Sequence, residues 1–104
     1  MIENYIVSEH RKNITNQGRS AEQFYWRDNN GVEIDLVVQG GQHHLPIEIK
    51  SAQTYSKEFA GNLKKWMTYS NVPAGYVVYD GPQEFTGSDG IEVMNWKSFL
   101  LRSV

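Results

Sequence analysis

Two acidic residues and a lysine interrupt apolar stretches of this sequence in a pattern that could support chemistry. Asp35 lies in the run EIDLVV, and Glu48 and Lys50 lie in the run PIEIK. Because successive side chains of a β-strand point to opposite faces, Glu48 and Lys50 are expected to share one face. A hairpin that joins the two runs can place Asp35 beside Glu48, with Lys50 one pleat further on.

Such a group favours metal-dependent hydrolysis. Two neighbouring carboxylates repel each other unless a proton or a cation lies between them. An oxygen-rich site of this kind suits Mg²⁺ or Mn²⁺, which keep several of their water ligands. The ion could polarise a phosphodiester and activate a water for attack. Lys50 could orient that water or stabilise charge on the phosphate oxygens.

The same residues also fit a second interpretation. Glu33, Asp35, Glu48 and Lys50 could form the solvated face of an antiparallel sheet, with cross-strand pairing between glutamate and lysine. The spacing of an Asp, twelve residues and then Glu-x-Lys occurs by chance in many charged chains. The metal site gains from its context, because both carboxylates interrupt apolar strands. The residues alone leave both interpretations open.

Apolar periodicity and turn residues predict the elements that would position this group. Period-two alternation predicts strands, and Val32, Ile34, Leu36 and Val38 are expected to share one face. A stripe at helical spacing, from Phe59 through Leu63 and Trp66 to Met67, predicts an amphipathic helix. The expected elements are a helix over 2–16, an antiparallel meander of strands over 22–28, 32–39 and 43–50, a helix over 56–70, a strand over 76–79, a loop over 81–90, a strand over 91–94 and a helix over 96–101.

In the first helix, Ile2, Tyr5 and Ile6 are expected to form an apolar edge.

Length and composition bound the class of protein. The chain has 104 residues, enough for one domain with one core, and 39% hydrophobic with 21% charged residues is an ordinary globular composition. It has no cysteine, which excludes disulfides and thiolate sites, and no apolar stretch of membrane-spanning length. The net charge of −2 argues against a strongly basic nucleic-acid surface. These features predict a cytoplasmic protein. The chain starts inside an expected helix, which indicates a fragment of a longer protein.

The ordered set of motifs resembles a known fold. The sequence is similar to PD-(D/E)XK, restriction-endonuclease-like domains and, more narrowly, to the uncharacterised C-terminal domain of bacterial and archaeal AAA+-type ATPases. The likeness covers nearly the whole chain, down to the strand GYVVY and the closing Trp96 segment. Its motifs are Glu3-Asn4, Tyr25-Trp26-Arg27, residues 33–37 and residues 47–50. The resemblance implies an α/β fold with a mixed sheet in the order α-β-β-β-α-β, followed by a C-terminal β-α extension.

The resemblance also implies roles for individual residues. Asp35 and Glu48 would be ligands of Mg²⁺ or Mn²⁺ together with the main-chain carbonyl of Ile49, and Lys50 would be the catalytic lysine. An acid on the first helix often assists in this fold. Glu3 is the best match for that acid, and Glu9 is the second. The implied activity is cleavage of DNA phosphodiester bonds.

Partners follow from the same resemblance and from the basic residues. The implied partner is an AAA+-type ATPase module, although the chain itself has no phosphate-binding Gly-x-x-x-x-Gly-Lys-Ser/Thr motif. Arg27, Lys57 and Lys64 are candidate contacts to nucleic-acid phosphates; a solvated helix face is the alternative for the two lysines. A module that keeps the fold without catalysis, and binds nucleic acid or protein, is the competing function. A purely structural fragment is the third.

Overall fold

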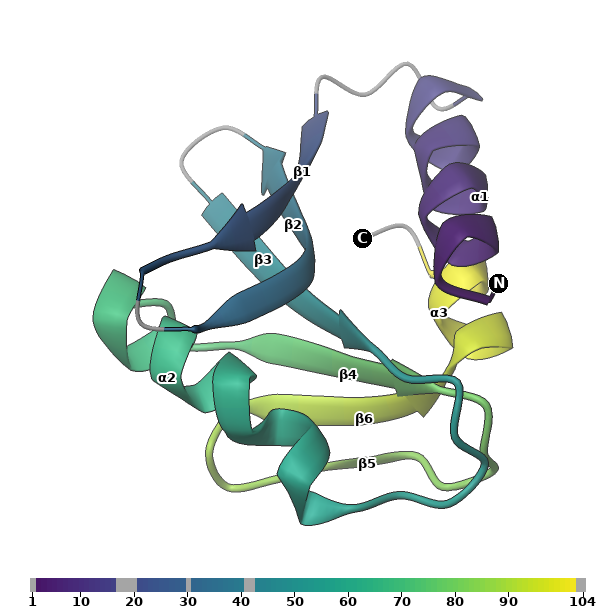
Figure 1. Cartoon of the computed structure of the whole chain (residues 1–104). Helices are drawn as coiled ribbons and strands as arrows, with labels where there is room; N and C mark the ends of the chain where they lie inside the picture. The colour runs from purple at the N-terminus through teal and green to yellow at the C-terminus, as the bar shows by residue number, and fades with distance from the viewer. Residues whose placement is uncertain (1, 17–20, 30, 41–42, 103–104) are drawn as a thin grey trace.

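The computed structural model describes residues 2–16, 21–29, 31–40 and 43–102. Within this part of the chain, six strands form one mixed sheet with helices packed against it (Figure 1). The elements are α1 (Ile2–Asn16), β1 (Ala21–Arg27), β2 (Glu33–Gly40), β3 (His43–Ile49), the 3₁₀ turn η1 (Lys57–Ala60), α2 (Gly61–Ser70), β4 (Gly75–Tyr79), β5 (Phe85–Thr86), β6 (Ile91–Asn95) and α3 (Trp96–Leu101). All of the predicted helices and strands are present.

The sheet joins an antiparallel meander to a parallel pair of strands. Its strand order is β1-β2-β3-β4-β6-β5. The predicted meander of β1, β2 and β3 is confirmed, whereas β3–β4 and β4–β6 are parallel and β5–β6 is antiparallel. The short β5 lies inside the segment expected to be a loop. Its two residues are exposed, so they have no apolar alternation from which a strand could be predicted.

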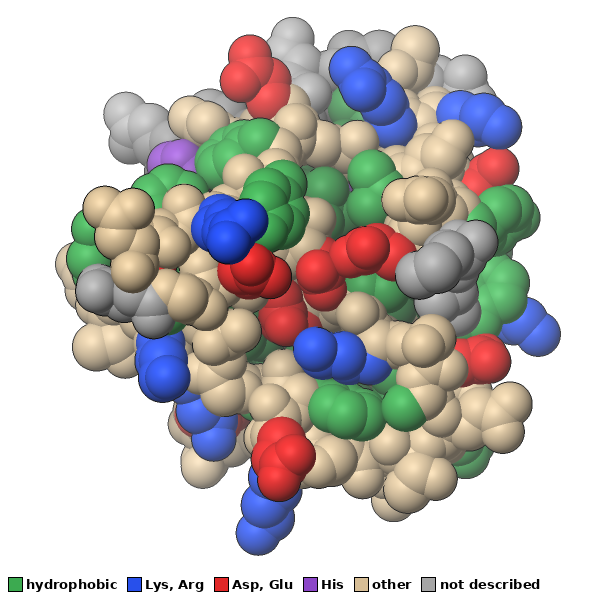
Figure 2. Space-filling model, in the orientation of Figure 1, with side chains coloured by type: hydrophobic (Ala, Val, Ile, Leu, Met, Phe, Trp, Pro, Cys, Tyr) green, Lys and Arg blue, Asp and Glu red, His purple; other side chains and the backbone are tan. Residues whose placement is uncertain are grey.

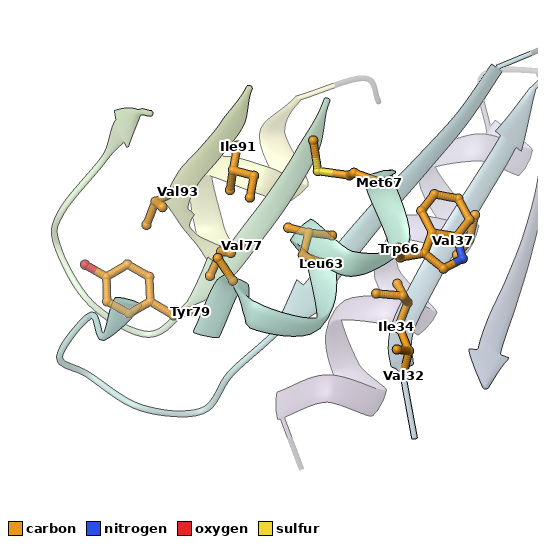
Figure 3. Close-up of a cluster of buried hydrophobic side chains, with 11 residues drawn as sticks. Val32, Ile34, Val37, Leu63, Trp66, Met67, Val77, Tyr79, Ile91 and Val93 are labelled. Atoms are coloured by element: carbon orange, nitrogen blue, oxygen red, sulfur yellow. The ribbon is translucent and has the colours of Figure 1, made fainter. Parts of the chain in front are cut away.

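One face of the sheet is covered by α2 (Figure 3). Leu63, Trp66 and Met67 are buried there against Val77 and Tyr79 of β4. These side chains form the predicted helical stripe, and Phe59 of η1 packs partly buried at its margin. The stripe gives α2 its apolar face, and burial of that face rather than intrinsic helix propensity holds this ten-residue helix in place.

The opposite face is covered by α1 and α3. Ile6 of α1 and Phe99 of α3 are fully buried against a second apolar cluster of the sheet, which includes Ile47 and Val78. Tyr5, expected on the apolar edge of α1, is instead 52% exposed. Its ring meets the edge of Trp96 with centroids 5.8 Å apart, so it lies at the rim between the two helices.

A β-bulge interrupts the pairing of β1 with β2. Phe24 of β1 pairs with Val37 of β2. The next pair along the ladder is Trp26 with Ile34. Residues 35–36 of β2 therefore stand opposite a single residue of β1. A bulge adds one residue to one strand and so changes which face the following side chains point to.

Because of the bulge, the prediction of which β2 side chains share a face is wrong. Val32, Ile34, Leu36 and Val38 were expected on one face, but the structure divides them between the two cores. Val32 and Ile34 pack in the cluster under α2, whereas Leu36 and Val38 pack in the cluster under α1 and α3. Strict alternation fails at the bulge, and this is the point at which Asp35 occurs.

No helix in the described ranges is long and apolar enough to cross a lipid bilayer.

Candidate active site

Asp35 and Glu48 lie side by side where regular pairing of β2 with β3 ends. Leu36 and Ile47 form the terminal pair of the ladder, and Asp35 and Glu48 occupy the next positions. Side chains replace the ladder there. The main-chain N–H of Ile49 donates to Asp35 Oδ2 at 2.9 Å, and the main-chain N–H of Asp35 donates to Glu48 Oε1 at 3.2 Å. The sequence prediction that these two carboxylates are neighbours is therefore confirmed.

Lys50 completes the predicted group. Its Nζ lies 3.6 Å from Glu48 Oε2. Its main-chain N–H donates to the carbonyl of Val78 at 2.8 Å, which ties this end of β3 to β4. The lysine side chain is 39% exposed while the side chain of Glu48 is 4% exposed, so the ammonium group reaches solvent above a buried carboxylate.

The surroundings of Glu48 disfavour its charged form. Burial is the largest cause, repulsion from Asp35 is the second, and together they raise the pKa of Glu48 from 4.5 to about 7. The ammonium of Lys50 and the hydrogen bond from the main chain of Asp35 act in the opposite direction. Near neutral pH the carboxyl of Glu48 is therefore poised between its protonated and ionised forms.

Glu3 brings a third acid to the same place from α1. Its hydrogen bond with Asp35 is the main reason that the pKa of Glu3 rises to about 7, with burial and repulsion from Asp35 adding to it and Lys50 opposing it. A hydrogen bond between two carboxyl groups needs a proton on one of them. Of the two predicted assisting acids, Glu3 reaches the site. Glu9 instead pairs with Lys12 at 3.3 Å on the surface of α1.

A cleft of about 590 Å³ opens beside this acidic group, between α1 and the β1–β2 strands. Asn4, Ser8 and Arg11 of α1 line this cleft and were not predicted from the sequence as site residues. Their spacing was the available signal, because positions 4, 8 and 11 of a helix lie on one face. Figure 2 shows acidic side chains gathered in the middle of the face that it displays, with basic ones beside them. The lining residues are Glu3, Asn4, Val7, Ser8, Arg11, Tyr25, Glu33 and Asp35.

One protein family matches nearly the whole chain. Residues 1–99 match the family described as "Domain of unknown function (DUF4143)". The chain belongs to this DUF4143 family. No curated protein and no solved structure matched the chain. The match runs from α1 into α3, so every residue of the acidic site belongs to the matched region.

The predicted phosphate contacts of this DUF4143 domain are not gathered in one place. Arg27 lies near the cleft, where its Nε is 3.5 Å from Glu33 Oε1. Lys64 lies on α2 and pairs with Asp89 at 3.4 Å, and Lys57 is exposed at the start of η1. Neither lysine lines the cleft beside Asp35. Their role in binding nucleic acid stays a prediction, and Arg27 alone is placed to act near the site.

The donors of the DUF4143 site fit a hard divalent cation that prefers oxygen ligands better than a metal that prefers nitrogen or sulfur ligands. Among the described residues, no group of three or more His, Cys, Asp and Glu side chains is arranged to hold a metal ion. Mg²⁺ needs less than that, because it keeps several waters and is often held by one or two carboxylates. Asp35 and Glu48 supply two carboxylates, and the carbonyl of Ile49 as a further ligand stays a prediction. An all-oxygen set of this kind suits Mg²⁺ or Mn²⁺.

Proposed function

We propose that this domain hydrolyses DNA phosphodiester bonds with the help of Mg²⁺ or Mn²⁺. The observation that supports this most is the reciprocal attachment of Asp35 and Glu48, which keeps two carboxylates together beside Lys50. A solvated sheet face, the alternative that the sequence left open, does not account for a glutamate that is 3% exposed. Charged side chains are rarely buried without a partner or a task.

Each residue has a distinct part in the proposed reaction. Asp35 and Glu48, with the carbonyl of Ile49, would hold the ion. The ion would polarise the phosphodiester and lower the pKa of a water. Lys50 would orient the attacking water or stabilise the charge that develops on the phosphate oxygens. In the metal-free site, Glu3 would share a proton with Asp35. It would release that proton when the cation binds.

The electrostatics of the cluster support a cation at this position. Burial raises the pKa of Glu48, a hydrogen bond to Asp35 raises that of Glu3, and repulsion from Asp35 adds to both shifts. The ammonium of Lys50 offsets only part of the negative charge of the three acids Glu3, Asp35 and Glu48. A divalent ion would relieve that repulsion and favour the ionised carboxylates. Binding of the ion near neutral pH should therefore release protons.

The wider setting is part of the proposal. The mixed sheet and the site are consistent with a PD-(D/E)XK, restriction-endonuclease-like fold. That assignment rests on the resemblance of the motifs. We propose that the domain acts in the cytoplasm beside an AAA+-type ATPase module, which would move or open the nucleic acid.

One observation favours a second function, a module that binds nucleic acid or protein without cleaving it. The oxygens of Asp35 and Glu48 accept hydrogen bonds from main-chain N–H groups, and these bonds hold β2 against β3. Carboxylates engaged in this way also have a purely structural value. On that interpretation, Mg²⁺ would leave the midpoint of thermal unfolding unchanged. Replacing Asp35, Glu48 or Lys50 would not change the affinity for a partner by way of a bound metal.

Metal titration separates the two functions. Mg²⁺ and Mn²⁺ are titrated calorimetrically into the wild type and into Asp35→Asn and Glu48→Gln, which keep the shape of each side chain and its acceptor oxygen. We expect the wild type to bind the ion with proton release near pH 7 and both variants to lose most of the affinity. A plasmid-nicking assay with each ion should give nicking by the wild type alone.

Glu58→Gln is the matched control, because Glu58 is an exposed glutamate on η1. It should bind metal and nick DNA as the wild type does. Failure of the wild type to bind metal at millimolar concentration and to nick DNA, even when joined to an ATPase module, would overturn the nuclease and leave the binding module.

A further inference from the structure

The cleft beside the acidic site has an exposed aromatic ring in its lining. Tyr25 of β1 lines the cleft and is 54% exposed. Much of its ring is therefore open to solvent. An exposed aromatic ring beside a cleft offers a face on which a flat ligand can stack.

The opposite wall of the cleft presents polar groups and one cation, with the acid Glu3 at its other end. Asn4, Ser8 and Arg11 of α1 line it, and Arg11 is exposed. Arg11 is eight residues from Glu3, which places it about 12 Å along the helix axis from the acidic end. The cleft thus runs from the acidic site towards a guanidinium group, and Tyr25 lines it from β1.

We propose that this cleft binds single-stranded DNA, with a base stacked on Tyr25 and a phosphate held by Arg11, and leads the strand to Asp35 and Glu48. An exposed ring together with a cation along a groove is the usual means of binding single strands without sequence preference. In a duplex the faces of the bases are already stacked, and freeing one costs several kcal/mol. The inference rests on the proposed nuclease, because that function explains why a strand would be led to the acidic site. The binding of the strand itself requires no cleavage.

Binding is measured by fluorescence anisotropy with a labelled oligonucleotide and with its duplex, in EDTA so that cleavage cannot occur. We expect the wild type to prefer the single strand. Tyr25→Ala should weaken single-strand binding roughly 5- to 150-fold, the range found when one base–aromatic stack is removed. Tyr25→Phe, which keeps the ring, should stay near the wild type, and Arg11→Ala should flatten the salt dependence of binding.

Lys12→Ala is the matched control, because Lys12 is the next residue on α1, carries the same charge and pairs with Glu9 outside the cleft. It should bind as the wild type does. Equal affinity for single strand and duplex, or an unchanged affinity of Tyr25→Ala, would overturn the proposal.

The same measurements keep this inference distinct from the nuclease. Single-strand binding that depends on Tyr25 without any nicking would support the inference while the nuclease fails. Nicking of duplex DNA that is unaffected by Tyr25→Ala would support the nuclease and overturn the inference.

Discussion

Asp35 and Glu48 each accept a hydrogen bond from the main chain of the other's strand. The N–H of Ile49 donates to Asp35 at 2.9 Å, and the N–H of Asp35 donates to Glu48 at 3.2 Å. The two carboxylates therefore take the place of a missing ladder bond, and the sheet itself keeps them together against their repulsion. Their relative position depends on the strands and should survive replacement by the matching amides.

The free energy of unfolding should depend on pH through Glu48 in metal-free buffer. Its pKa rises from 4.5 to about 7 in the folded chain, so the folded state binds this proton more tightly than the unfolded state. The resulting stabilisation is complete below pH 4.5 and is lost as the pH rises to about 7. Glu48→Gln should therefore gain about 3 kcal/mol relative to the wild type between pH 4.5 and pH 8. Urea unfolding at both pH values measures it, and a difference that does not change with pH would contradict it.

Lys50→Ala should separate metal binding from cleavage. The ammonium lowers the pKa of Glu48 and of Glu3, so its removal should raise both values further, measurable by NMR titration of the carboxyl carbons. Metal affinity should stay largely intact, while nicking should fall about 10²- to 10³-fold, as when one transition-state donor is lost. Lys65→Ala, an exposed lysine of α2, is the control. Nicking by Lys50→Ala at the wild-type rate would exclude this role for Lys50.

Leu63 should be among the more costly positions to truncate. Its side chain is fully buried between α2 and the sheet. Leu63→Ala should lower the free energy of unfolding by about 2–5 kcal/mol, because it removes buried methyl groups and leaves a cavity. Lys65→Ala on the exposed side of the same helix should change it by less than about 0.5 kcal/mol. Denaturant unfolding of both variants tests the assignment of the helix face, and equal losses would contradict it.

Two glycines should respond in opposite directions to substitution by alanine. Gly90 has φ +86° and its added Cβ would meet the carbonyl of Pro73, so Gly90→Ala should destabilise the fold by more than about 1 kcal/mol. Gly61 starts α2 in a helical conformation with open space around it. Gly61→Ala should stabilise the fold by about 0.4–1 kcal/mol. Thermal unfolding of both variants measures the contrast, and a stable Gly90→Ala protein would show that this turn can rearrange.

Local sequence patterns were sufficient for the helices, for every strand except β5 and for part of the site. The apolar stripe that ends at Trp66 and Met67 predicted α2, and turn residues separated the strands of the meander. The neighbourhood of Asp35 and Glu48 followed from antiparallel pairing, because a hairpin sets which positions face each other. These features depend on residues close in sequence, which is why they could be predicted without the fold.

The sequence alone determined the meander, the main helices and the pairing of Asp35 with Glu48. The tertiary structure decided what surrounds them. It placed Ile34 and Leu36 in different cores through a bulge that strict alternation does not predict. The packing of α1 over the sheet also opened the cleft lined by Tyr25. These relationships depend on how separate elements dock, which is set by burial summed over the whole molecule and leaves no mark on the residues next to each side chain.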